Sequence, residues 1–96
     1  MARYRRIERE YIFAYQWPGY RCSEEPNWFT QAFDEGCIFL VYKSKDNKKH
    51  LHAITDTGVE VVNVGDYIES EYEGSLKIHR KEVFENTFQL EPETHE

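Results

Sequence analysis

Turn signals divide the second half of the chain into short apolar segments. Cys37 to Tyr42 is a continuous apolar run of strand length, and a polar stretch follows it. The turn signals stand at Asp46-Asn47, Asp56-Thr57-Gly58, Gly65-Asp66 and Glu73-Gly74. Parallel strands need connections of about a dozen residues or more, and these connections are shorter. The pattern therefore predicts consecutive antiparallel hairpins, with strands at 37–42, 51–55, 59–64, 67–72 and 76–78.

The first half predicts one strand and one helix. Tyr11 to Trp17 is rich in aromatic and β-branched residues, and Pro18-Gly19 ends it. Ser23 is expected to cap the helix, with Pro26 in its first turn and Gly36 just beyond its last. One face of this helix would carry Trp28, Phe29, Ala32 and Phe33.

A short closing helix is expected from Arg80 to Thr87, with Val83, Phe84, Thr87 and Phe88 on one face. The sum is an α+β fold: a small antiparallel sheet of about five to six strands, with one helix packed on it and a short C-terminal helix. We expect a single domain over 1–90 and an acidic tail over 91–96.

Composition narrows the function classes. The 96-residue chain has a formal net charge of −6, and phosphate neutralisation needs a basic face, so we expect no direct nucleic-acid binding. Cys22 and Cys37, without a signal peptide, are typical of reduced thiols in a cytoplasmic protein. The longest apolar run is too short to span a membrane.

Signatures of catalysis are not found in the sequence. It has no phosphate-binding loop, dinucleotide fingerprint or nucleophile elbow. His50 and His52 alternate on one strand, but a metal would need further ligands such as Asp56 or Cys37. We therefore expect a protein without enzymatic activity, without a metal and without a cofactor.

Two sets of residues resemble a known family. The opening has Tyr4-Arg5-Arg6 followed by Gln16-Trp17-Pro18-Gly19, and the later part has Gly65-Asp66-Tyr67-Ile68, Gly74 and Val83-Phe84-Glu85-Asn86-Thr87-Phe88. These motifs resemble small tailed-phage and prophage proteins similar to the PGDYG type. The family's proline after the basic cluster is missing, and Phe13 stands where the family has Glu. The resemblance implies a phage accessory protein in the host cytoplasm and supplies no reaction.

The recurring motif residues are first interpreted as structural. Gly65-Asp66 and Gly74 suit tight turns, because glycine accepts positive φ and an aspartate side chain can bond the nearby backbone. Tyr67 follows the first of these turns, and Phe84 and Phe88 are expected to anchor the closing helix in the core.

A ligand site is hypothesised where the basic and aromatic ends of the chain could converge. Arginine suits phosphate because its planar fork bonds two oxygens at once. The alternative is that these cations are solvated flanking residues. The candidate set is Tyr4, Arg5, Arg6, Gln16, Trp17, Tyr20, Lys77, His79 and Arg80.

Three functions stay open. The first is a phage accessory protein that counteracts a host anti-phage defence by sequestering a small nucleotide-like anionic ligand. The second is an inhibitor of a host protein that docks through an exposed sheet edge or through an acidic surface that imitates nucleic acid. The third is an uncharacterised small enzyme or metal site. The acidic surface would comprise Glu69, Glu71, Glu73, Glu91, Glu93 and Glu96. A homo-oligomer is expected, because an aromatic-rich sheet can cover an exposed face by pairing.

Overall fold

A computed structural model describes residues 3–6, 11–71 and 74–90. The elements follow the chain in the order β1 (Arg3–Arg6), β2 (Tyr11–Gln16), α1 (Asn27–Asp34), β3 (Ile38–Lys43), β4 (Lys48–Thr55), β5 (Gly58–Val62), β6 (Tyr67–Ser70), β7 (Leu76–His79), α2 (Lys81–Thr87) and β8 (Phe88–Leu90). The acidic tail expected over 91–96 and Glu73 of the last expected turn lie outside the described residues.

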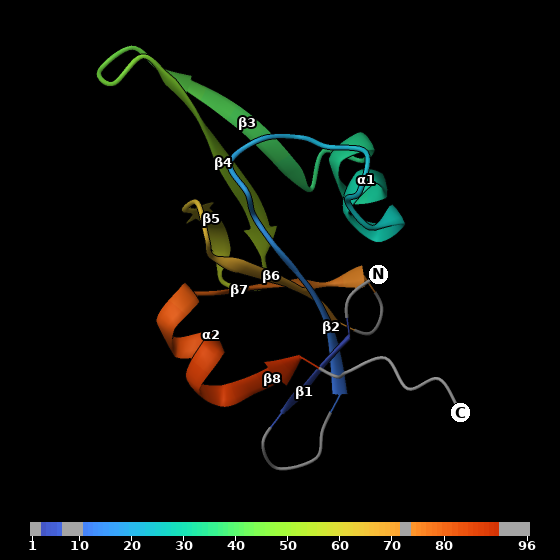
Figure 1. Ribbon diagram of the computed structural model, residues 1–96. Coiled ribbons are helices and arrows are strands. Elements are labelled where there is room, and N and C mark those ends of the chain that lie inside the picture. The colour runs from blue at the N-terminus through green and yellow to red at the C-terminus, as the bar shows by residue number, and fades with distance from the viewer. Residues whose placement is uncertain (1–2, 7–10, 72–73, 91–96) are drawn as a thin grey trace.

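The strands form two antiparallel sheets (Figure 1). One is five-stranded with the order β7-β6-β2-β1-β8, and the other is three-stranded with the order β3-β4-β5. The α+β class, the antiparallel pairing, the packed helix and the short C-terminal helix are confirmed. The division into two sheets was not indicated by the sequence, because period and turn signals report strands and not their grouping.

The five-stranded sheet is the middle layer. On one face, Ile68 and Leu76 belong to the same core cluster as Phe29 of α1 and as Ile38 and Leu51 of the other sheet. On the opposite face, Ala14 and Tyr67 pack against Phe84 of α2. Helix α2 therefore covers one side of this sheet, while α1 and the three-stranded sheet cover the other (Figure 1).

Helix α1 begins later than the capping pattern predicts. Its N-cap is Pro26, which is extended and makes no side-chain capping bond, so the expected cap at Ser23 is wrong. A proline disfavours helical geometry in the residue before it, which keeps Glu25 and Ser23 out of the helix. The expected C-terminus is confirmed, because Gly36 has φ of 81°. The amide of Gly36 bonds the carbonyl of Phe33, and the next amide bonds that of Ala32, which is the Schellman arrangement.

Strands β1 and β8 were not predicted. Strand β1 pairs with both β2 and β8, and its sequence Arg-Tyr-Arg-Arg has no apolar alternation from which a strand could be inferred. Strand β8 follows α2 directly, with Phe88 as the C-cap of the helix and the first residue of the strand.

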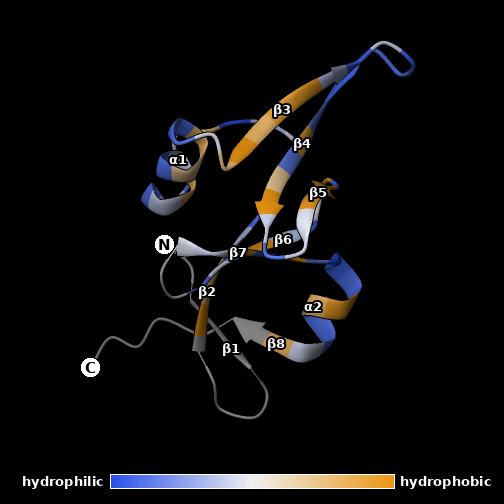
Figure 2. Cartoon of the chain, turned by 180° about the vertical axis from the view of Figure 1, so that it is seen from behind, coloured by the Kyte–Doolittle hydropathy of each residue, from blue (hydrophilic) through white to orange (hydrophobic). Residues whose placement is uncertain are grey.

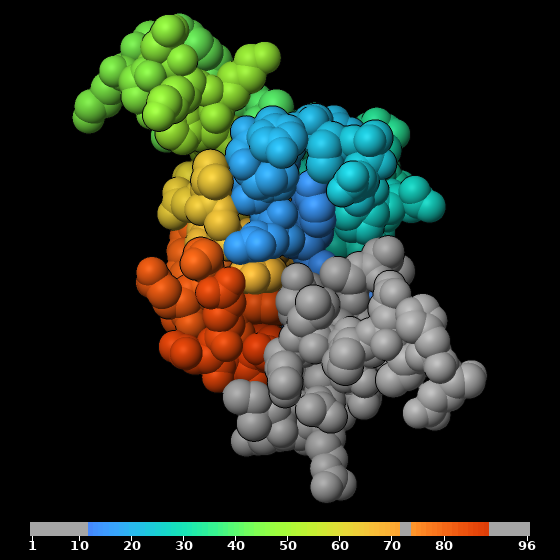
Figure 3. Space-filling view, viewed as in Figure 1, coloured from blue at the N-terminus to red at the C-terminus, as the bar shows by residue number. Residues whose placement is uncertain are grey.

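The β3–β4 hairpin extends beyond the rest of the molecule (Figures 1 and 3). The overall extents are 49 × 26 × 26 Å, and the projecting hairpin ends in the turn at Asp46-Asn47 that the sequence predicts. Asn47 takes φ of 56°, a left-handed conformation that asparagine tolerates. We call residues 42–49 the tip, and every one of them is exposed.

Candidate binding surface

Asp66 connects three parts of the fold. Its buried carboxylate accepts hydrogen bonds from the amide of Asn63 at 3.0 Å and from the amide of Lys81 at 3.1 Å. It also accepts a bond from the Arg80 guanidinium at 2.5 Å. Asp66 therefore closes the turn between β5 and β6 and holds the first amide of α2 to that turn. This arrangement is structural, as first interpreted from the sequence.

The residues before Asp66 fasten the same turn to the end of β2. The Gly65 amide donates to the Trp17 carbonyl at 2.8 Å, and the Trp17 amide donates to the Asp66 carbonyl at 2.9 Å. The side-chain amide of Gln16 donates to the Gly65 carbonyl at 3.2 Å. Gly65 has φ of 94°, so a residue with a side chain would be strained there.

Trp17 is a core residue. Its side chain is buried and stacks on Phe29 with ring centroids 5.9 Å apart. An indole held in this way is closed to a ligand, so Trp17 stabilises the contact between β2 and α1.

An aromatic cluster fixes α2 on the five-stranded sheet. Phe84 stacks on Tyr67 at 3.9 Å and on Phe88 at 4.6 Å between ring centroids. His79 touches both phenylalanine rings and bonds the Glu69 carboxylate at 2.7 Å. The imidazole and the Glu69 carboxylate thus form a hydrogen-bonded pair beside the cluster.

Gly74 lies in the connection from β6 to β7 and has φ of 85°.

The hypothesised anion site is spread over the molecule. Tyr4, Arg5 and Arg6 lie on β1, which β2 and β6 separate from β7. Arg80 is paired with Asp66, whereas Lys77 is exposed on β7. Of the candidates whose side chains are described, Trp17 is in the core, His79 and Arg80 are in ion pairs, and the others line two separate hollows. These side chains do not form one anion site.

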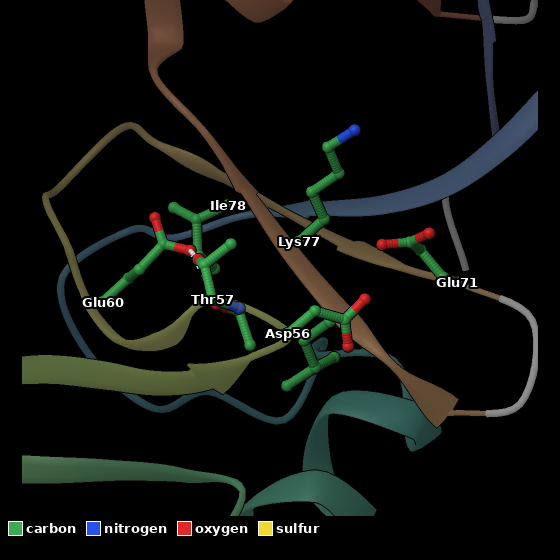
Figure 4. Close-up of a pocket in the computed structure, with 8 residues that line it drawn as sticks. Asp56, Thr57, Glu60, Glu71, Lys77 and Ile78 are labelled. Atoms are coloured by element: carbon green, nitrogen blue, oxygen red, sulfur yellow. Dashed lines mark hydrogen bonds between the residues drawn. The ribbon is translucent and has the colours of Figure 1, made fainter.

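The first hollow lies between the β4–β5 turn and β7 and has a volume of about 400 Å³ (Figure 4). Lys77 extends away from the side chains of Asp56 and Glu60, and the Thr55 hydroxyl donates to Glu60 at 2.8 Å. Three carboxylates and one ammonium group make this hollow unfavourable for an anion. The lining residues are Thr55, Asp56, Thr57, Glu60, Glu71, Leu76, Lys77 and Ile78.

The second hollow contains Gln16 and Tyr20 and has a volume of about 350 Å³. The Tyr15 hydroxyl lies 3.4 Å from the Cys22 sulfur, and burial followed by this contact raises the pKa of Tyr15. Tyr15 is therefore a neutral phenol near neutral pH. Glu24 also lines the hollow, and none of the described residues that line it is basic, so they provide no positive charge for an anion.

One face of the three-stranded sheet is an open apolar surface that the sequence pattern did not indicate. Strand register places Phe39, His52 and Val61 in one row and Ile54 beside Val59 in another. Ile54 is 48% exposed and Val59 is 58% exposed. We call this surface the outer face; Figure 2 shows the hydrophobic colouring along β3. It consists of Phe39, Val41, His50, His52, Ile54, Val59 and Val61. Successive side chains of β4 and β5 point to opposite faces of the sheet, and this alternation is the sequence signal that could have revealed the outer face.

His52 is the distinctive polar group of the outer face. Its ring stacks on Phe39 with centroids 5.6 Å apart, and its Nε2 atom is buried without a hydrogen-bond partner among the described residues. Burial, followed by the positive charges of Lys43 and His50, lowers the pKa of His52. The imidazole of His52 thus contributes mainly ring surface to this face, through its stacking on Phe39.

Metal and nucleophile chemistry find little support in the described part of the chain. Within it, no group of three or more His, Cys, Asp or Glu side chains is placed to hold a metal. His50 bonds Asp46 at 2.6 Å, and both Cys22 and Cys37 are free thiols that are partly buried. In residues 3–6, 11–71 and 74–90, no helix has the length and apolar character to cross a membrane.

Comparison with protein family models, with curated protein sequences and with solved structures found no match. The likeness to phage proteins and the source that it implies therefore enter below as proposals, as does a host target.

Proposed function

We propose that the protein acts without catalysis, by docking on another protein through the outer face of the three-stranded sheet. The observation that carries this proposal is the cross-strand pair of Ile54 and Val59, both about half exposed on an open apolar face. Contiguous apolar surface of this kind is typical of interaction sites, because burying it against a partner is favourable.

The neighbouring polar groups support a specific contact. His50 lies on the same face, and its ring bonds the Asp46 carboxylate at 2.6 Å, so a polar pair borders the apolar residues. Apolar contacts supply affinity and polar groups at the border supply orientation, the usual division of roles in protein interfaces.

The likeness to phage proteins supports a host protein as the partner. Under this proposal the protein is a phage accessory protein that inhibits a host factor, such as one of an anti-phage defence, inside the host cell. Sequestration of a nucleotide-like anion has less support, because Trp17 is buried, Arg80 and His79 are paired, and both hollows contain carboxylates.

A site-specific cross-linker tests the proposal. A photoreactive residue placed at Val59 is expected to cross-link a host protein in lysate, whereas the same residue at Val83, which is 62% exposed on α2, is not. Excess wild-type protein should suppress the cross-link, and excess of the double variant Ile54→Lys and Val59→Lys should not. Equal cross-linking from both positions, or equal competition by both proteins, would contradict docking through this face.

A second copy of the chain is the competing occupant of the outer face. Light scattering separates the two cases: a dimer that Ile54→Lys and Val59→Lys dissociate would assign the face to self-association. A monomer that gives the competed cross-link supports the host partner.

A further inference from the structure

The tip of the β3–β4 hairpin concentrates positive charge. It contains Lys43, Lys45, Lys48 and Lys49, and Asp46 is its one acidic residue. The tip therefore has a formal charge of +3, while the remainder of the chain has −9, from a total of −6. The net charge of the whole chain conceals this separation.

The tip lysines are not neutralised by described carboxylates. The ion pairs in the described part of the chain involve Arg21, His50, His79, Arg80 and Lys81, and none involves a tip lysine. Asp46 is itself occupied, since it accepts bonds from the His50 ring and from the Lys48 amide. The four ammonium groups are thus free to contact an external anion.

The tip is also remote from the acidic remainder. Ile38 is level with Glu60, because both pair with Ala53. A strand rises about 3.3 Å per residue, so Lys43 lies roughly 17 Å along β3 from that level. This reach exceeds the screening length of about 8 Å at physiological salt, beyond which exposed charges hardly affect each other. The projection seen in Figures 1 and 3 therefore lets the tip act as a basic module on an acidic protein.

The tip has the shape and charge density for a duplex. The major groove of B-DNA is about 12 Å wide and admits a two-stranded ribbon, with phosphates along both of its sides. Duplex DNA carries one charge per about 1.7 Å of its axis, and the tip presents three lysines on its paired strands and Lys45 in its turn to these charges. A bond between the Tyr42 hydroxyl and the Asn47 side chain holds the ribbon together across its turn.

We propose that the β3–β4 tip binds the phosphate backbone of duplex DNA. The contact is independent of base sequence, because lysine acts as a point charge and phosphates carry no sequence information. It is confined to the tip, since the acidic remainder repels the duplex. The net charge alone led us to expect no nucleic-acid binding, and this proposal departs from that expectation because the positive charge is concentrated at the tip.

Fluorescence anisotropy with a short labelled duplex tests this inference at low salt. The wild-type protein is expected to bind, with log K falling against log salt at a slope of roughly −2 to −4 for up to four phosphate contacts. The double variant Lys45→Gln and Lys48→Gln should weaken binding by about tenfold or more, since each phosphate contact depends on one cation. The control Lys77→Gln and Lys81→Gln removes the same charge elsewhere and should change binding by less than about twofold.

Competitor and variant controls decide whether the tip binds DNA. No binding at low salt, or equal weakening by both double variants, would overturn the inference. Displacement of the duplex by polyglutamate at equal charge concentration would assign the tip to an acidic protein instead. The variant Ile54→Lys and Val59→Lys should still bind DNA, so failure of the outer-face proposal leaves this result unaffected. Circular dichroism confirms that each variant is folded.

Discussion

At the scale of the residue, Asp66 has the largest structural role of the polar side chains described. It lies in a turn that the sequence marks with a glycine and an aspartate, and its carboxylate joins that turn to the start of α2. A buried acceptor that satisfies two backbone amides is expensive to remove, because both donors would lose their partner.

We therefore expect Asp66→Ala to lower the free energy of unfolding by about 2–3 kcal/mol. Arg80→Gln, which removes the half-exposed cation of the same pair, should cost less than about 1 kcal/mol, since solvent screens it. Urea unfolding followed by tryptophan fluorescence measures both. If the two variants were equally unstable, the ion pair and not the backbone bonds would be the source of the stability.

His52 makes stability depend on pH. Its pKa is lowered in the folded state, with burial as the first cause. The unfolded chain takes up a proton near the ordinary histidine pKa of about 6.5, while the folded protein stays neutral until a lower pH. The unfolded state therefore binds more protons in this window, and stability falls as the pH falls through it.

The measurement is the free energy of unfolding in urea at about pH 7.5 and about pH 5.5, on either side of the ordinary histidine pKa. His52→Gln should lose less stability between these values than the wild type, whereas Val83→Ala, an exposed change that removes no titratable group, should behave as the wild type. An unchanged pH dependence in His52→Gln would contradict the role given to His52.

At the scale of the element, the sequence predicts what local physics determines. The strand at β2, the C-terminus of α1 at Gly36 and the hairpin turns follow from periodicity and from residues that permit positive φ. Strand β1 could not be predicted in this way, because pairing with β2 and β8 on both sides makes a strand of a charged segment. The start of α1 was misjudged because Pro26 outweighs a favourable capping residue.

The residues of the candidate site were harder to predict than the strands and helices, because their roles depend on tertiary structure. Trp17 looks like a ligand platform in the sequence, and only the packing of Phe29 against it shows that it is core. The outer face needs the strand register, which brings Ile54 beside Val59. Neither fact can be inferred from the spacing of residues along the chain.

Phe84 packs helix α2 onto the five-stranded sheet. This residue is buried and stacks between Tyr67 and Phe88, so Phe84→Ala should cost about 3–5 kcal/mol through lost burial and the cavity left behind. Val83→Ala, one position away and 62% exposed, should change stability by less than about 0.5 kcal/mol. Thermal unfolding measures both, and a small effect of Phe84→Ala would show that α2 docks by other contacts.

At the scale of the whole molecule, the protein separates a packed body from a projecting hairpin. Core clusters join both sheets and both helices, whereas every residue of the tip is exposed. Surface ion pairs such as that of His50 and Asp46 contribute little stability. The tip is thus retained at little benefit to folding, which is consistent with a role in binding.

Shortening the hairpin tests this separation. Val41 and His50 are already paired across β3 and β4, so residues 42–49 can be replaced by Asn-Gly, the two-residue connection that suits a tight hairpin. We expect the free energy of unfolding to change by less than about 1 kcal/mol, because all the deleted residues are exposed and a shorter loop loses less entropy. Urea unfolding should also give an almost unchanged slope, since that slope reports the surface exposed on unfolding. A loss above about 2 kcal/mol would show instead that the tip belongs to the cooperative fold, because exposed residues alone rarely cost so much.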